Sequence, residues 1–359
     1  MMSDLILWRA LLVLLVLAMS ALLLLPGVRE WRQGRSRPLV IPADDEAGID
    51  YFGQRMRGHL ARDWGGTEAA PVPDLRRQPP PEGYFVLGTN GRVRGDVATE
   101  RQASKTIVGN AISVDPGVSI MGDVYASQAL STGPGCVVRA VLADGPVVLG
   151  DGSSLLRWAD AEKLECGRDC RLLGRVSARE SIALGHGTIF GRLAAPRIEF
   201  GPADAGEFAV PVGKATPSNI GELLGERLEE AFSQQGRWVC RGDLEVPDGT
   251  LVTGHLIVHG RLYLGEDCEV VGSVKCHKGA EIGARARIHG SIFAGGPVAL
   301  GEGSEIEGMV SSERAVTCER HARIGSLEHP ASLIAPVLSV AAGTVVYGSA
   351  WASREGRVV

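Results

Sequence analysis

Apolar residues recur at every sixth position over the carboxyl-terminal third of this 359-residue chain. Counting Ala and Cys, fourteen of the fifteen positions in this first frame are apolar, and a second frame four residues on holds no charged residue. The first frame comprises Cys240, Val246, Val252, Val258, Leu264, Val270, Cys276, Ile282, Ile288, Ala294, Leu300, Ile306, Ser312, Cys318 and Ile324. The second comprises Leu244, Thr250, Leu256, Leu262, Cys268, Val274, Ala280, Ala286, Ile292, Val298, Ser304, Val310, Val316 and Ala322. Most charged residues lie between the frames, which indicates short strands with one buried and one solvated face.

Three hexads combine into a repeat of 18 residues. Glycines recur at this spacing in two series, Gly254, Gly272, Gly290 and Gly308, and Gly265, Gly283 and Gly301. A triangular coil explains the repeat, because each side is then a short strand and glycine turns the corners. Such coils stack as parallel strands about 4.8 Å apart, with side chains alternately inside and outside. The pattern predicts an all-β fold, the parallel β-helix.

The same unit recurs more loosely in the first half of the chain. The phrase V-x-G-x-V-x-A and close variants occur at 93–97, 120–126, 172–178 and 189–195. We therefore expect a first β-helix segment at 84–201, a second at 238–352 and a tail at 353–359. About a dozen coils are expected in all.

A helical insertion is expected between these segments, at 202–237. Pro217-Ser218-Asn219 is a typical helix start. The apolar face of this helix would consist of Ile220, Leu223, Leu224, Leu228, Ala231 and Phe232. We expect the insertion to lie on the solenoid, where it either caps the first segment or bridges a continuous stack.

Residues 1–27 predict a transmembrane anchor. The run from Leu5 to Leu25 has 21 residues with Arg9 as its only charge, and about 20 residues suffice to cross a bilayer. A cleaved signal peptide is the alternative, but no small-residue cleavage site follows. The arginines after the span, at positions 29, 32, 35 and 37, favour a bacterial inner-membrane protein with a cytoplasmic body, and a periplasmic body is the alternative.

Residues 28–83 form the juxtamembrane segment and linker. An amphipathic helix is expected at 50–63, with Tyr51, Phe52, Met56 and Leu60 on its apolar face. Residues 70–82 contain five prolines, and this composition predicts a stiff, extended spacer.

Composition and charge exclude several classes of protein. With 45% hydrophobic residues the body is not intrinsically disordered, and its 48 glycines show no three-residue period of collagen. The net charge of -5 gives no reason to expect a nucleic-acid partner. An odd number of cysteines, seven, excludes a fully paired disulfide framework and favours a reducing compartment. No phosphate-binding loop motif indicates a nucleotide.

The V-x-G-x-V-x-A phrases on a coil of 17 to 18 residues, beside an amino-terminal anchor, resemble the bactofilin family. These are bacterial polymer-forming cytoskeletal proteins. The clearest phrases are 270–276 and 288–294, and the resemblance covers about 84–201 and 238–352. It implies a right-handed β-helix that assembles end to end without nucleotide. The insertion, the doubled solenoid and the long linker depart from the family pattern.

We therefore expect a non-enzymatic, membrane-anchored scaffold that forms an end-to-end homo-oligomer or filament. Envelope or polysaccharide-synthesis proteins are its expected further partners. No cofactor is expected, and no residue is assigned a catalytic, cofactor-binding or metal-ligating role. Strand edges at the ends of a β-helix template further pairing, and contacts between unlike ends propagate into filaments. The final coil, around Val346 and Trp351, is the expected end contact, so that Val346→Lys would block assembly without unfolding the β-helix.

Histidines raise one alternative, a hexapeptide-repeat acyltransferase. His259 and His277 are 18 residues apart and should stack on one outer face, about 4.8 Å from each other. A general base or a weak metal pair could form there, but two solvated histidines are the simpler interpretation. The same interpretation applies to His255, His289 and His321.

Cysteines and corner acids have equally simple explanations. Cys166 and Cys170 lack zinc-knuckle spacing and a second pair, so we expect them to fill the core, as do Cys240, Cys268, Cys276 and Cys318. The Gly-Asp and Gly-Glu corners at 150–152 and 265–267 are expected to be turns rather than calcium sites. A periplasmic polysaccharide-binding or polysaccharide-cleaving β-helix is the other alternative, although the outward aromatic residues Tyr263, Phe293 and Trp158 do not align.

Overall fold

A computed structural model describes residues 19, 50–64, 80–87, 90–95, 105–201, 216–217 and 236–359. The chain divides into two compact units, Met1–Gly48 and Ile49–Val359, and the described strands all belong to the second. The predicted span at 5–25 lies outside the described residues except for Met19. Within the described ranges, no helix has the length and apolar character needed to cross a membrane.

The elements are almost entirely strands. The one helix described in Ile49–Val359 is α2 (Tyr51–Trp64), where a helix was expected at 50–63, although Tyr51 is exposed. The first half contains β1 (Tyr84–Val86), β2 (Asn90–Val93), β3 (Thr106–Val114), β4 (Ser119–Thr132), β5 (Val137–Ala143), β6 (Val147–Leu149), β7 (Ser154–Cys166), β8 (Arg171–Leu184) and β9 (Ile189–Phe200). The second half contains β10 (Thr216–Pro217), β11 (Arg237–Cys240), β12 (Leu244–Val246), β13 (Thr250–Thr253), β14 (His255–Val258), β15 (Arg261–Leu264), β16 (Glu269–Val271), β17 (Val274–Cys276), β18 (Gly279–Ile282) and β19 (Arg287–Ile288). It continues through β20 (Ile292–Ala294), β21 (Val298–Leu300), β22 (Glu305–Ile306), β23 (Val310–Ser312), β24 (Ala315–Cys318), β25 (Arg323–Ile324), β26 (Ala331–Val340) and β27 (Thr344–Val358).

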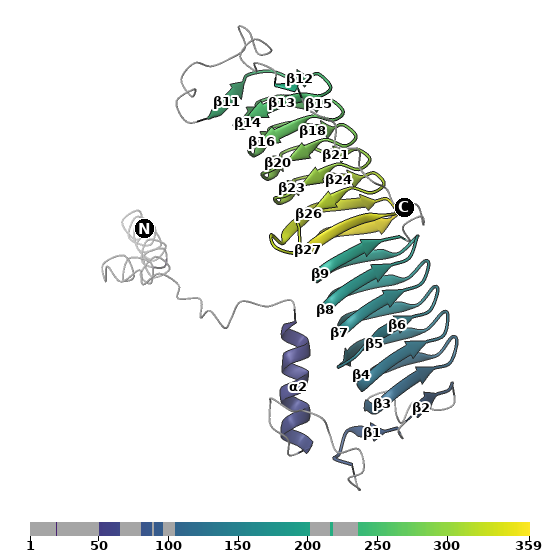
Figure 1. Ribbon diagram of the computed structural model, residues 1–359. Helices are drawn as coiled ribbons and strands as arrows, with labels where there is room; N and C mark the ends of the chain where they lie inside the picture. Colours follow the sequence, from purple (N-terminus) through teal and green to yellow (C-terminus); the bar gives the residue numbers. More distant parts are fainter. Residues whose placement is uncertain are drawn as a thin grey trace, which may run out of the picture. The chain divides into compact units, whose positions relative to one another are not determined.

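Both halves are parallel β-solenoids, and together they make about 13 turns (Figure 1). In the second half each coil pairs with the next at a step of 18 residues, as in Leu262 with Ala280. In the first half the step is mostly 17, as in Val124 with Val141. The predicted parallel β-helix is confirmed.

The two hexad frames form the core of the second half. All residues of both frames are buried, including Ser312, the one polar exception in the first frame. Glycine is required where coils approach closely: a Cβ at Gly174 would overlap the carbonyl oxygen of Arg157. Gly254 in addition has a φ of 116°, a conformation that other residues rarely adopt.

The two halves run in opposite directions and meet at their last coils. Strand β9 pairs antiparallel with β27, with Ile198 opposite Val346 and Phe190 opposite Gly356. In Figure 1 the carboxyl terminus accordingly lies midway along the solenoid, beside β9. The core continues across the junction, where the rings of Phe190 and Phe200 lie 5.5 Å apart.

This junction corrects three expectations. The stack does not continue in one direction, because a turn number read from periodicity carries no information on how two halves meet. The expected tail at 353–359 instead continues β27 as far as Val358, since β26 pairs with this segment on one side and β9 on the other. The final coil contacts the chain's own first half, and Val346 is fully buried there. Val346→Lys would therefore destabilise the fold.

The predicted insertion lies largely outside the described residues. Thr216 and Pro217 form β10, which pairs with β13 at the far end of the second half. The expected helix that starts at Pro217 has no other described residue.

Candidate functional site

Helix α2 covers one outer face of the first half. Tyr125, Leu142 and Trp158 point outward from β4, β5 and β7, yet each is at most 8% exposed. Leu60 of α2 packs on this patch, and Phe52 stacks on Trp158 with ring centroids 6.2 Å apart. The patch therefore fixes α2 to the solenoid through apolar contact.

A polar network joins α2 to the sheet beside this patch. Arg57 of α2 forms ion pairs with Asp144 and, at 3.5 Å, with Asp160. Tyr125 donates a hydrogen bond to Asp144 at 2.6 Å, and Ser177 donates one to Asp160 at 2.8 Å. Buried charges persist only when they are paired in this way, so the network specifies where α2 lies.

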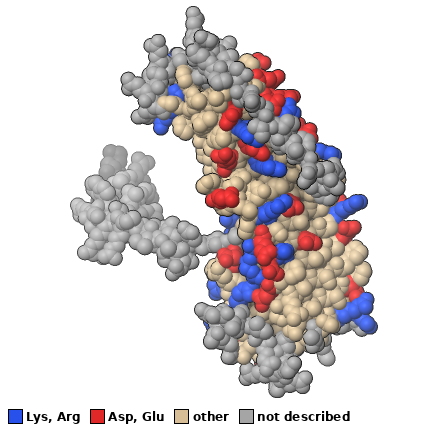
Figure 2. Space-filling model, viewed as in Figure 1, with Lys and Arg blue, Asp and Glu red and all other residues tan. Residues whose placement is uncertain are grey.

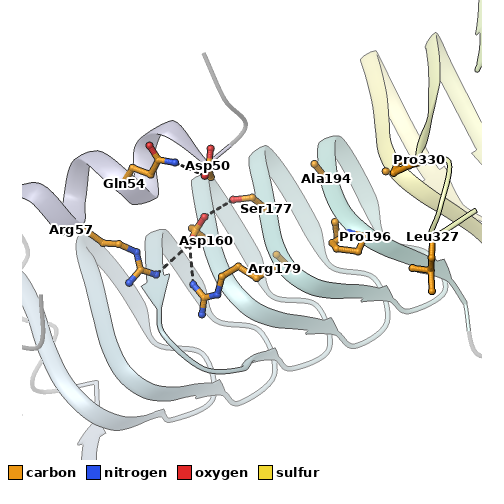
Figure 3. A pocket seen from close by; sticks show the side chains of 13 residues that line it. Asp50, Gln54, Arg57, Asp160, Ser177, Arg179, Ala194, Pro196, Leu327 and Pro330 are labelled. Atoms are coloured by element: carbon orange, nitrogen blue, oxygen red, sulfur yellow. Dashed lines mark hydrogen bonds and ion pairs between the residues drawn. The ribbon is translucent and has the colours of Figure 1, made fainter. Parts of the chain in front are cut away.

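A groove of about 610 Å³ opens beside this network, at the level where the two halves meet (Figure 3). Asp160 lies between the guanidinium groups of Arg57 and Arg179, and the Arg179 pair measures 3.8 Å. The rest of the lining is small or apolar, with Ala178, Ala194, Pro196 and Gly348 beside Leu327 and Pro330 of the second half. A volume of this size suits a small ligand.

Burial shifts the pKa of several groups in the network. It raises the pKa of the Asp160 carboxyl, although the nearby hydroxyl and guanidinium groups act in the opposite direction. Burial and the bond to Asp144 raise the pKa of Tyr125, so its hydroxyl stays protonated. For Arg57, burial acts to lower the pKa, but the hydrogen bond and charge of Asp144 prevail and raise it.

These groups suit a positioning role better than proton transfer. A general acid must reach a substrate atom within hydrogen-bond distance, whereas Asp160 is 6% exposed and its oxygens already contact Ser177 and two arginines. Over the part of the chain that the structure describes, no three His, Cys, Asp or Glu residues are placed to hold a metal ion.

The structure brings His259 and His277 together as expected. Their rings stack on one outer face with centroids 4.6 Å apart, and both side chains are exposed. His255 is also exposed, and its Nδ1 accepts a hydrogen bond from the backbone N–H of Ser273 at 2.9 Å. His321 is half-buried.

His289 departs from the expectation of a solvated side chain. Its Nε2 lies 2.8 Å from Glu269 and its Nδ1 lies 2.9 Å from Glu307. The hydrogen bond to Glu269, followed by that to Glu307, raises its pKa despite some burial. The result is a charged bridge across neighbouring coils.

All seven cysteines are free and buried, which confirms that they fill the core. Burial raises the pKa of Cys276 and of Cys318 to about 12. The hydrogen bond with Cys170, together with burial, raises the pKa of Cys166. Thiols in this state are poor nucleophiles and poor metal ligands.

The corner acids bond to backbone rather than to an ion. Asp151 accepts a hydrogen bond from the N–H of Arg168 at 2.8 Å, and Asp248 accepts one from Glu266 at the same distance. Each joins one coil to the next. The expectation of corner turns is thus supported by the contacts of these acids.

Ion pairs also tie the coils together on the outside. Glu305 contacts Arg287 at 3.2 Å and Arg323 at 3.5 Å, across three successive coils. Figure 2 shows acidic and basic side chains next to one another on the visible face. Each exposed pair stabilises the fold by about 0–1 kcal/mol.

Sequence reasoning missed the network below α2. One signal was present: Tyr125, Leu142 and Trp158 are large apolar residues at outward positions of successive coils, and such a column indicates a covered face. The column breaks at Asp160, the register partner of Leu142. The partner of Asp160, Arg57, is over 100 residues away in sequence, and periodicity does not connect the two.

Comparison with known proteins identifies no relative. No family model, curated protein or solved structure matches the chain. The resemblance to bactofilins therefore depends on the repeated phrases and the coil length alone.

Proposed function

We propose that this protein is a non-enzymatic, membrane-anchored scaffold of the bactofilin type, whose right-handed β-solenoid assembles end to end. Residues 5–25 would supply the anchor, with the body in the cytoplasm at the bacterial inner membrane. Envelope or polysaccharide-synthesis proteins would be its further partners.

The observation that carries this proposal is the junction inside the chain. There, two solenoid ends join through antiparallel pairing of β9 with β27, and the hydrophobic core continues across the contact. The junction is a working example of end-to-end association by strand edges of this sequence. The same physics applies to an end contact between two molecules.

The ends open to such contact are the first coils of the two halves. Among the described residues, no strand pairs with the outer edges of β1 and β2 or of β11 and β12. Because both ends are amino-terminal coils, strands that meet there would pair antiparallel, as at the junction. This replaces the expected contact through the final coil.

Negative-stain electron microscopy of the full chain in a nonionic detergent, without nucleotide, tests the proposal. Filaments several times longer than one molecule are the expected result. Single particles at all protein concentrations would contradict it.

A variant pair at one end sharpens this test. Gly236 and Cys240 of the edge coil accept bonds from β14, so by alternation the N–H of Arg237 points away from β14. Arg237→Pro removes that outward donor and should shorten the filaments. Arg237→Gln removes the same charge but keeps the N–H, and should assemble as wild type does. Equal filament lengths for the two variants would exclude edge pairing at β11.

A further inference from the structure

Four large side chains form a row across the junction between the halves. Trp158, Arg175, Arg192 and Trp351 are successive register partners on β7, β8, β9 and β27. The Arg175 guanidinium lies over the ring of Phe52, 5.6 Å from its centroid, and that of Arg192 lies 4.9 Å from the centroid of Trp351. Two arginines thus stand side by side, each held against an aromatic ring.

The charge of this arginine pair is not balanced by the protein. Like charges directly opposite each other on neighbouring strands are destabilising. Within the described ranges neither Arg175 nor Arg192 forms a hydrogen bond or an ion pair with a carboxylate, whereas Arg57 and Arg179 on the same face both do. Burial, and then the charge of Arg175, lowers the pKa of Arg192.

We propose that Arg175 and Arg192 form a binding site for a phosphate group. Each guanidinium offers five N–H donors in a planar fork that matches two oxygens of a phosphate. A tetrahedral phosphate has enough oxygens for both forks, while a carboxylate has only two. The dianion also neutralises both arginines at once.

Trp351 indicates what can be attached to this phosphate. Its ring is 42% exposed and lies directly beside Arg192. It therefore offers an apolar surface to the group that carries the phosphate, whether this is a soluble phosphate ester or a phospholipid. Both sources share the chemistry recognised by the arginine pair.

Thermal unfolding of the full chain in nonionic detergent tests the site. A ligand that binds only the folded state raises the unfolding midpoint in a saturable manner. Inorganic phosphate should therefore raise the midpoint relative to sodium chloride at equal ionic strength. Dibutyryl phosphatidic acid is the second probe: apparent affinity at least tenfold above that of inorganic phosphate assigns the site to lipid, and equal affinity assigns it to free phosphate.

Matched variants locate the effect. Arg175→Gln and Arg192→Gln should each weaken phosphate binding by about tenfold or more, because one charged fork is lost. Arg171→Gln changes the net charge equally on the same strand, and should bind as wild type does. In chloride alone, the midpoints of the first two variants should equal or exceed that of wild type, since repulsion is relieved.

Two results would overturn the proposal. One is a wild-type midpoint that does not respond to phosphate. The other is a response that Arg175→Gln and Arg192→Gln both retain. Should a glutamine variant fail to fold, Arg175→Lys and Arg192→Lys keep the charge but lose the fork, and they too must weaken phosphate binding.

Discussion

Truncation of Val346 is the most direct test of the junction. Its side chain is fully buried between Ile324 of the preceding coil and Ile198 of the first half. Val346→Ala removes two methyl groups, which costs about 1.6 kcal/mol in lost burial at ~0.8 kcal/mol each. A residual cavity of ~30 Å³ adds about 0.7 kcal/mol. The expected loss of stability is therefore ~2 kcal/mol.

Circular dichroism of the full chain in detergent measures this loss as a lower unfolding midpoint. For a unit of this size, ~2 kcal/mol corresponds to a fall of about 3–5 °C. Val337→Ala, on the neighbouring strand β26, is the matched control because Val337 is 40% exposed, and it should lower the midpoint by less than ~1 °C.

The opposite pattern would refute the reasoning. If Val346→Ala left the midpoint unchanged and instead dissolved the filaments, the final coil would be an assembly surface between molecules. The pairing of β9 with β27 would then not be an internal contact of one chain.

Two further predictions concern polar side chains of the second half. Ser304→Ala should leave stability unchanged or raise it, because the buried Ser304 hydroxyl has no hydrogen-bond partner among the described residues; Ser312→Ala should cost about 1–3 kcal/mol, because that hydroxyl makes three bonds of 2.8 to 3.1 Å. Urea unfolding of both variants checks this, and equal losses would contradict it. The raised pKa of His289 predicts stability that is fully present below pH ~6.5 and is lost as pH rises through the folded-state pKa. The unfolding midpoint measured from pH 5 to 9 should therefore fall across this window in wild type and less in His289→Gln; parallel curves would exclude the bridge as the cause.

The coil could be predicted from sequence because its constraint is local and repeated. Every coil must place small or aliphatic side chains inside, so positions such as Val252 and Val270 report the same geometry many times over. The helix at 51–64 was equally accessible, since its apolar face is written within 14 residues.

The junction and the site beneath α2 could not be predicted in this way. A period of 18 is the same whether a second stack continues upward or returns downward, so nothing in the frames distinguishes a continuous stack from two opposed halves. Asp160 and Arg192 acquire their roles from single contacts with Arg57 and Trp351, far away in the chain. Such contacts occur once, and a repeat pattern holds no trace of them.

The reversal of direction also sets the order of events during synthesis. Strand β27 is the last strand to leave the ribosome, yet it is the strand that covers the edge of β9. Each half can form coil by coil from its own amino-terminal end, but the β9 edge stays unpaired until translation of the chain is nearly complete. An exposed edge in a nascent chain is a point of misassociation with neighbouring chains, and a late frameshift or truncation that removes β27 would leave that edge permanently open.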